Sequence, residues 1–188
     1  PGLFAQESMP IITLPDSLAD GVWYLGMMMT NSSTTDGNPD NNIVASATTF
    51  TKSTRPSNDN CADAITILDG TTAFDNLNAS TDGEVHDECM YGGSTYNDVW
   101  YVYESPMSGI ITATTCEQLG GSADYDTDIV LYVGGSCGSL TLIGCNEDDQ
   151  VNDCGNFPDY QSTATGTVQE GDTVYIRVGA YGANDEGS

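Results

Sequence analysis

The stretch Tyr125–Cys154, YDTDIVLYVGGSCGSLTLIGCNEDDQVNDC, decides the fold of this chain. Asp128–Val133 is an apolar run of strand length that is rich in β-branched residues. The break at Gly134-Gly135-Ser136 is followed by a second apolar run over Leu140–Ile143. This pattern predicts a β-hairpin with an acidic loop at each end.

Carboxylates gather on both sides of the expected hairpin, and Glu147 is one of those that follow it. Like charges on neighbouring loops repel one another unless water, salt or a cation neutralises them. Hard cations prefer the oxygens of carboxylates, amides and main-chain carbonyls, so we expect Ca²⁺ to stabilise these loops. The alternative is that the same residues cap turns and stay solvated. The expected calcium ligands are Asp126, Asp128, Asn146, Asp148 and Asp149.

The charge balance is strongly acidic, with 28 Asp and Glu against 3 Lys and Arg in 188 residues, a formal net charge of −25. That field repels nucleic-acid phosphates and anionic membrane surfaces. No apolar run approaches the roughly 18 residues of a membrane span. We therefore expect neither a nucleic-acid partner nor membrane insertion. Divalent cations and neutral glycans are compatible partners, and the acid could equally serve only to keep a secreted protein soluble.

Six cysteines fall between Cys61 and Cys154. An even number of cysteines in a chain rich in Gly, Thr, Asn and Asp indicates an oxidising compartment, so we expect an extracellular or cell-surface location. We expect one bridge to close the central hairpin, one to tie the start of the domain to its long loop, and one to join a strand end to the acidic loop. These pairs are Cys137–Cys145, Cys61–Cys89 and Cys116–Cys154.

The N-terminal region predicts a hairpin of its own. Val22–Thr30 and Ile43–Thr51 are strand candidates on either side of the polar loop Asn31–Asn42. A lone hairpin is marginal in water. We therefore expect the apolar surface of Trp23 or of the Met27–Met29 run to need a partner.

This region resembles the C-terminal half of the bacterial cell-adhesion-related domain (CARDB). The resemblance implies an incomplete immunoglobulin-like β-sandwich over residues 1–52. It covers about the last 40 residues of such a domain. The residues that carry it are Gly21, Tyr24, Leu25, Gly26, Asn41 and Asn42.

A linker is expected over residues 53–57, followed by a second domain over residues 58–188. The second domain contains several short strand candidates separated by turns, which predicts an all-β sandwich or jelly roll stapled by disulfides. The candidates besides the central hairpin are Thr71–Phe74, Asn97–Glu104, Gly109–Thr115, Ser162–Val168 and Thr173–Val178.

The second domain resembles the cysteine-rich variant of the bacterial pre-peptidase C-terminal (PPC) domain. The matching stretches are NDNCADA, NDVWYVY, YDTDIVLYVGGSCGSLTLIGCNEDD and DTVYIRVGAYG. The resemblance implies a small sandwich appended to secreted proteases, adhesins and surface proteins, with calcium- and collagen-binding relatives. It also implies a second candidate calcium site, formed by Asn58, Asp59, Asn60 and Asp98.

The chain departs from the PPC pattern after its Gly-rich turn, where such domains have one more strand. The sequence up to Ser188 does not contain it. We therefore expect that strand to come from elsewhere in a longer polypeptide or from a neighbouring copy.

Catalytic residues are not expected. His86 is the only histidine, and no Gly-x-Ser-x-Gly elbow accompanies it. Pairs of acids suited to glycoside hydrolysis are too numerous for any one pair to be informative.

Together these patterns predict a non-catalytic, calcium-stabilised module of a large secreted or cell-surface bacterial protein, acting in adhesion, assembly or substrate targeting. One alternative is a carbohydrate- or collagen-binding accessory domain of a secreted hydrolase. Another is a subunit of an extracellular filament joined by strand exchange. The expected partners are other segments or copies of the parent protein, with a glycan or a matrix protein as a further candidate.

Overall fold

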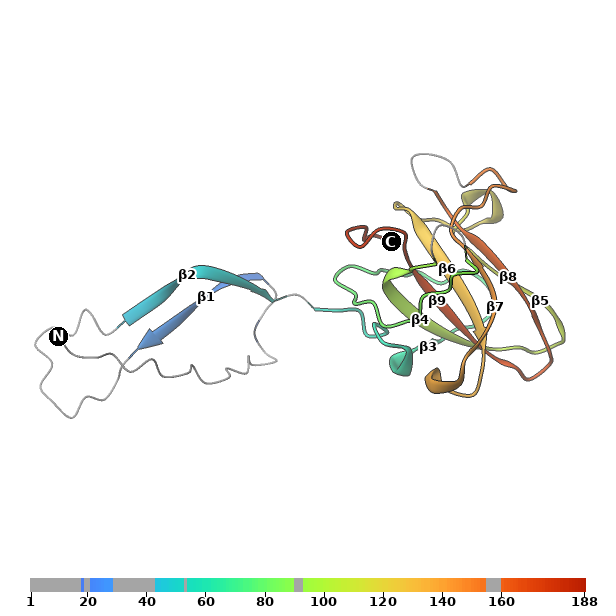
Figure 1. The fold of residues 1–188 in the computed structure, drawn as a ribbon, viewed down its shortest axis with the longest axis horizontal. Helices are drawn as coiled ribbons and strands as arrows, with labels where there is room; N and C mark the ends of the chain where they lie inside the picture. The colour runs from blue at the N-terminus through green and yellow to red at the C-terminus, as the bar shows by residue number, and fades with distance from the viewer. Residues whose placement is uncertain (1–17, 19–20, 29–42, 53, 90–92, 155–159) are drawn as a thin grey trace, which may run out of the picture. The chain divides into compact units, whose positions relative to one another are not determined.

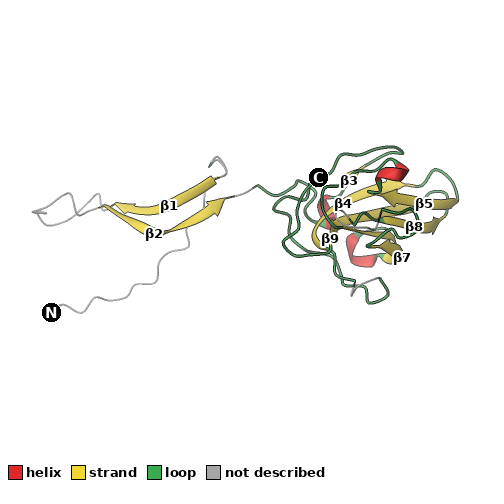
Figure 2. Cartoon of the chain, turned by 90° about the horizontal axis from the view of Figure 1, so that it is seen from above, coloured by secondary structure: helices red, strands yellow, loops and turns green. Residues whose placement is uncertain are grey.

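A computed structural model of the chain describes residues 18, 21–28, 43–52, 54–89, 93–154 and 160–188 (Figure 1). The chain divides into two compact units, Pro1–Thr54 and Arg55–Ser188. This division falls inside the expected linker. Regular structure in the described residues is almost entirely β-strand, with a few single 3-10 turns (Figure 2). None of the described helices has the length and apolar character needed to cross a membrane.

The first unit contains one antiparallel hairpin, formed by β1 (Gly21–Met28) and β2 (Ile43–Lys52). Val22 and Tyr24 are 64% and 67% exposed, whereas Trp23 between them is half-buried. One face of β1 is therefore uncovered by the described residues of this unit. The side chains of the expected Met27–Met29 surface are not among those described. Asn41 and Asn42, which carry part of the CARDB resemblance, lie outside the described residues.

The second unit is an all-β sandwich, as the sequence predicts. Its larger sheet has the order β3-β4-β9-β6-β7, and β5 and β8 form a separate two-stranded sheet. All hydrogen-bonded neighbours are antiparallel except β3 and β4. The strands are β3 (Ile65–Thr66), β4 (Tyr96–Glu104), β5 (Gly109–Thr114), β6 (Thr127–Val133), β7 (Thr141–Asn146), β8 (Thr163–Val168) and β9 (Thr173–Ala180).

Both faces of the larger sheet are covered, which explains why the β6 sequence is apolar without alternation. Side chains of a strand point alternately to its two faces. Ile129 and Leu131 accordingly enter the main core, which also contains Ile176 of β9. Val130 and Tyr132 point the other way and pack in a second cluster on the opposite face. Burial on both sides replaces the polar–apolar alternation of a half-exposed strand.

The strand expected over Thr71–Phe74 is wrong. The structure instead has β3, where Ile65 lies opposite Tyr101, and the Ile67 N–H donates to the Val102 carbonyl at 2.9 Å. Pairing with β4 thus ends just before residue 68, and residues 71–74 continue without strand structure. The Thr-rich composition of this segment is compatible with a strand, but the segment lacks a paired neighbour among the described strands.

All six cysteines form disulfides, but two of the expected pairs are wrong. The bridges are Cys61–Cys137, Cys89–Cys145 and Cys116–Cys154, so only the third pair is confirmed. Cys137 lies in a 3-10 turn before β7, and Cys145 lies near the far end of that strand. An extended chain rises about 3.3 Å per residue. The two cysteines are therefore too far apart for the roughly 4.4–6.8 Å between the Cα atoms of a disulfide.

Candidate functional site

The ends of three strands bring carboxylates together. Ile129 is paired with Asn146 across β6 and β7, so Asp128 and Glu147 follow at neighbouring positions at this end of the hairpin. The main-chain carbonyl of Asp126 accepts a hydrogen bond from the Tyr181 N–H just beyond β9. Asp128 and Glu147 are only 3% and 5% exposed. The antiparallel register therefore places acids from separate loops in a largely buried cluster.

Three oxygens of this cluster are buried without a hydrogen-bond partner. They are Oδ1 of Asp126, Oδ1 of Asp128 and Oε2 of Glu147. The other carboxylate oxygen of Asp128 accepts a hydrogen bond from Thr95 Oγ1 at 2.6 Å. An unpaired buried polar atom is unfavourable, and an ionised carboxylate is more unfavourable still. The cluster therefore needs either protons or a cation.

The protonation of these acids reflects their surroundings. Burial, followed by the charges of Asp128, Asp148 and Asp126, raises the pKa of Glu147 to about 8. Burial, followed by the charges of Asp148, Asp185 and Asp128, raises the pKa of Asp126 to about 7. Burial also raises the pKa of Asp128. Near neutral pH the group thus holds protons that isolated carboxyl groups would have released.

Two of the expected calcium ligands serve local structure. Asn146 donates through Nδ2 to the Asp148 carbonyl at 3.1 Å, and its Oδ1 accepts the Thr163 N–H at 2.7 Å. Asp149 Oδ1 accepts main-chain N–H groups from the two residues at the start of the following turn, at 3.0 and 2.9 Å. These bonds are the turn-capping alternative that the sequence left open. Asp126, Asp128 and Asp148 are the expected ligands that belong to the electrostatic cluster.

Glu147 and Asp185 belong to the same cluster but were absent from the expected ligand set. A signal for Glu147 exists in the hairpin pattern, because the pairing of two antiparallel strands predicts which residues meet at their ends. Asp185 follows β9, and its segment is held by Asn97, whose Nδ2 donates to the Asp185 carbonyl at 3.1 Å. No motif in the sequence links Asp185 to the hairpin.

The fit of this cluster to a metal ion is partial. Among the described residues, no three His, Cys, Asp or Glu side chains converge closely enough to hold a metal. A hard cation would therefore take part of its oxygen ligands from main-chain carbonyls or water. The unpaired oxygens have suitable chemistry for Ca²⁺, and calcium binding stays a prediction.

The second expected site has its polar atoms engaged in other bonds. Asn58 Nδ2 donates to the Trp100 carbonyl at 3.0 Å. Asp59 accepts from Arg55 Nη1 at 3.0 Å, and Asn60 donates to its neighbour Asp63 at 3.3 Å. The Asn58 bond joins the start of the unit to β4, and the other two bonds are local to that first segment. Calcium binding here also stays a prediction, and the first cluster has the stronger physical case.

Asp98, the fourth residue of that second set, belongs to a buried ion pair. Arg177 is 1% exposed, and its Nη2 lies 2.5 Å from Asp98 Oδ2. Arg177 also donates to the main-chain carbonyls of Glu84 and Thr95, both at 2.7 Å, and lies over the Trp100 ring. Arg177 follows Ile176 in β9, and the sequence gives no sign of its partner Asp98.

Neighbouring groups complete the network around the ion pair. Burial raises the pKa of Asp98 to about 6, against the opposing effect of the Arg177 charge, so this carboxyl is mainly ionised at neutral pH. His86 Nε2 lies 2.9 Å from the Tyr132 hydroxyl, and the histidine side chain is mostly buried. His86 therefore packs as part of a structural network rather than as a solvated loop residue.

Comparison of the chain with protein-family models, with curated proteins and with solved structures found no match.

Proposed function

We propose that this chain is a calcium-stabilised, non-catalytic module of a secreted or cell-surface protein, acting in adhesion, assembly or substrate targeting. The resemblances to CARDB and PPC domains support a role of this class. A bound Ca²⁺ would take one or two of its ligands from Asp126, Asp128 and Glu147 and the rest from main-chain carbonyls or water, with the charge of Asp148 nearby. Its chemical contribution would be to neutralise the cluster and hold the loops at this end of the sandwich together.

The observation that carries the calcium proposal is the group of buried carboxylate oxygens without hydrogen-bond partners. Solvated surface acids do not have this property, because water satisfies them. A cation neutralises several carboxylates at once and accepts their lone pairs as ligands. Protons alone neutralise the cluster only while the pH stays below its raised pKa values.

An extracellular location is supported by two independent features. The three disulfides of the second unit are typical of proteins that mature in an oxidising compartment. The net charge of −25 favours a well-solvated protein and is compatible with a medium that contains millimolar divalent cations. Both features suit a module outside the cell.

Thermal unfolding with and without calcium tests the proposal. At ten times the dissociation constant, a bound ligand stabilises a protein by roughly 1.4 kcal/mol, which is about 3–6 °C in melting temperature for a unit of this size. EDTA should lower the melting temperature at pH 7.5, and Ca²⁺ should restore it more effectively than equal Mg²⁺. Asp126→Asn should abolish this response.

Glu104→Gln is the matched control, because Glu104 is an exposed acid at the end of β4, outside the cluster. This variant should keep the full calcium response. Equal responses of the two variants, or a melting curve of the wild-type protein that is the same in EDTA and in millimolar Ca²⁺, would rule the calcium proposal out.

A further inference from the structure

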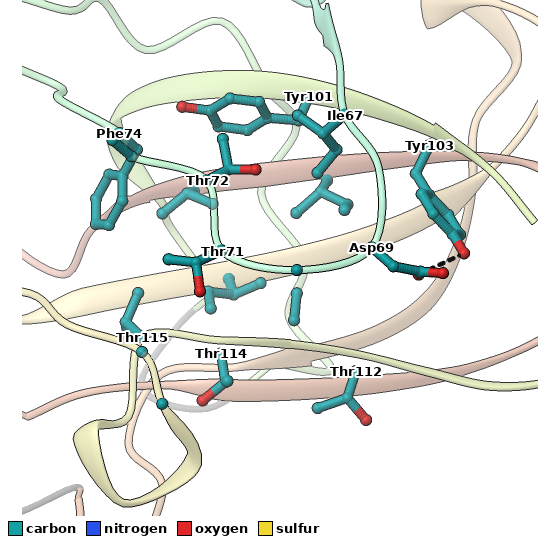
Figure 3. Close-up of a pocket in the computed structure, with 18 of the residues that line it drawn as sticks. Ile67, Asp69, Thr71, Thr72, Phe74, Tyr101, Tyr103, Thr112, Thr114 and Thr115 are labelled. Atoms are coloured by element: carbon teal, nitrogen blue, oxygen red, sulfur yellow. Dashed lines mark hydrogen bonds between the residues drawn. The ribbon is translucent and has the colours of Figure 1, made fainter.

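A cavity of about 740 Å³ opens into the main core beside β5, and we call it the β5 groove (Figure 3). One wall is β5 with the residues that follow it, and the other is the segment 67–74. Side chains of the larger sheet form the floor, among them Tyr101, Ile129 and Ile176. These three side chains are 6%, 1% and 7% exposed, so the floor is the outer boundary of the core. Among the described strands, none crosses the groove.

The β5 wall presents a free strand edge. Among the described strands, β8 is the one hydrogen-bonded neighbour of β5. The Thr115 N–H donates to the Ser162 carbonyl at 2.9 Å, and Thr114 lies opposite Thr163. In an antiparallel ladder, this alternation directs the main-chain groups of Ile110, Thr112 and Thr114 away from β8. Of these three residues, Thr112 and Thr114 line the groove.

The opposite wall also has unpaired main chain. The hydrogen bonds among the described residues include none that engages an N–H or carbonyl group of residues 68–74. Residues 68–73 are exposed. The two walls of the groove thus both offer backbone donors and acceptors. An extended segment lying between them could pair on either side.

The lining has the chemistry of a half-buried strand site rather than of a charged ligand site. Threonines line both walls, Thr71 and Thr72 on the segment 67–74 and Thr112, Thr114 and Thr115 on and after β5 (Figure 3). Asp69 is the one Asp or Glu side chain among the lining residues, and it already accepts a hydrogen bond from the Tyr103 hydroxyl at 2.8 Å. Leu68 and Leu119 stand at the rim, 80% and 47% exposed. An uncharged occupant with apolar side chains on one face matches this lining.

One end of the groove is bounded by the main chain of Gly187 and Ser188, which is hydrogen-bonded to two other segments. The Asn76 N–H donates to the Gly187 carbonyl at 3.2 Å, and the Gly187 N–H donates to Asn76 Oδ1 at 2.7 Å. Ser188, which also lines the groove, donates its N–H to Asp124 Oδ1 at 2.9 Å. Main chain running between these two segments is therefore hydrogen-bonded on both sides.

We propose that the β5 groove binds an extended peptide strand of another polypeptide, with apolar residues alternating with Ser or Thr. The apolar side chains would cover the floor, and the main chain would pair with the edge of β5. The peptide would be the partner in the assembly or adhesion role proposed above, so this inference rests on that role. A second copy of this chain is the less suitable donor, because two chains that each carry a net charge of −25 repel each other.

A labelled synthetic peptide, acetyl-Gly-Thr-Val-Thr-Val-Thr-Val-Gly-amide, is the probe. Fluorescence anisotropy should show saturable binding to the full chain. Hydrogen exchange should show that the peptide protects the amides of Ile110, Thr112 and Thr114. Thr112→Pro removes the outward N–H while leaving the β8 ladder intact, and should weaken binding at least about tenfold. Thr112→Val keeps the strand edge and should bind within about twofold of the wild-type protein.

A peptide with Asp in place of each Val should not bind. Failure of the apolar peptide to bind, or binding that leaves the exchange of the three β5 amides unchanged, would overturn the proposal. Self-association of the wild-type chain that is lost in Thr112→Pro would identify a second copy as the occupant and would overturn the partner assignment. Since peptide binding is read separately from calcium-dependent melting, either proposal can fail while the other stands.

Discussion

Two buried polar clusters of the second unit differ in how their charges are neutralised. Arg177 and Asp98 form an ion pair whose donors and acceptors are satisfied on several sides. Asp126, Asp128 and Glu147 are acids without a basic partner inside their own cluster, and each has a buried oxygen that lacks a hydrogen bond. The clusters are neighbours: Thr95 accepts from Arg177 through its carbonyl and donates to Asp128 through its hydroxyl.

The difference indicates that the Arg177–Asp98 pair has a structural role and that the acid cluster is suited to binding a cation. A charge that is buried beside its counter-charge is mainly ionised at neutral pH and holds loops in place. Acids that are buried together change their protonation near neutral pH or take up a cation. Mutation of the ion pair should therefore lower the stability of the protein with little effect on its calcium response. The acid cluster should make that stability depend on calcium and on pH.

The largest effect is expected from Arg177→Leu. This change leaves Asp98 buried without its counter-charge and removes the donors to the Glu84 and Thr95 carbonyls. Breaking one partner of a buried pair typically destabilises a protein by about 3–5 kcal/mol. Urea unfolding followed by tryptophan fluorescence should show a loss of this size.

Arg55→Ala is the control for that prediction. Arg55 pairs with Asp59, but its side chain is 59% exposed, and pairs of this kind contribute about 0–1 kcal/mol. If Arg177→Leu lowers the free energy of unfolding as little as Arg55→Ala does, the buried pair does not stabilise the fold in the way proposed.

Removing the Cys116–Cys154 disulfide should cause the next largest loss in the free energy of unfolding. It should also affect the acid cluster more than the ion pair. The bridge spans 38 residues, for which loop entropy gives about 3–4 kcal/mol. The Cys154 N–H also donates to the Asp149 carbonyl, so the bridge anchors the acidic loop. Replacing both cysteines by Ser should therefore also reduce the calcium response.

The corresponding double Ser variant of Cys61 and Cys137 is the matched comparison. This bridge lies beside Trp100 and Tyr132, on the side of the ion pair. The variant should lose similar stability but keep its melting shift with Ca²⁺. If both double variants keep the shift, the acidic loop does not depend on its disulfide.

Much of the sandwich could be predicted because it depends on local patterns. The apolar run of β6 and the alternation of Val174, Ile176 and Val178 with other residues in β9 identify strands without knowledge of their partners. The cysteine pairing depends on which loops meet, which local patterns do not encode, so two pairs were wrong. The Cys137–Cys145 pair could nevertheless have been excluded, because an extended strand lies between its members. Residues 71–74 show the opposite error, a strand-like composition without a strand to pair with.

The candidate site was predictable only where the hairpin itself brings residues together. Asp126 and Asp128 were found because they flank the central hairpin, whereas Asp185 comes from the segment after β9. Arg177 could not be matched to Asp98, because the two residues come from β9 and from an irregular stretch of β4, where the register shifts between Tyr96 and Val99. A bulge of this kind redirects side chains in a way that period-two counting does not anticipate.

The smallest of these effects is the pH dependence of the acid cluster. The pKa values of Glu147 and Asp126 are raised to about 8 and about 7, so the folded protein holds protons that the unfolded chain releases. In EDTA, the free energy of unfolding should therefore fall as the pH rises from about 6.5 to about 8.5, by roughly 2–3 kcal/mol. Asp98, with a pKa of about 6, has largely completed its titration below this range.

Glu147→Gln and added calcium should both flatten that slope, for different reasons. The glutamine cannot ionise, so this variant should be more stable than the wild-type protein at pH 8.5 in EDTA. A bound Ca²⁺ keeps the carboxylates ionised at lower pH, so the wild-type protein in saturating calcium should gain most of its stabilisation at high pH, where no proton competes for the ligands. Urea unfolding at several pH values measures both effects. A wild-type slope in EDTA that Glu147→Gln leaves unchanged would place the titrating groups outside the cluster, and the contrast between its unpaired acids and the Arg177–Asp98 pair would then lose its electrostatic basis.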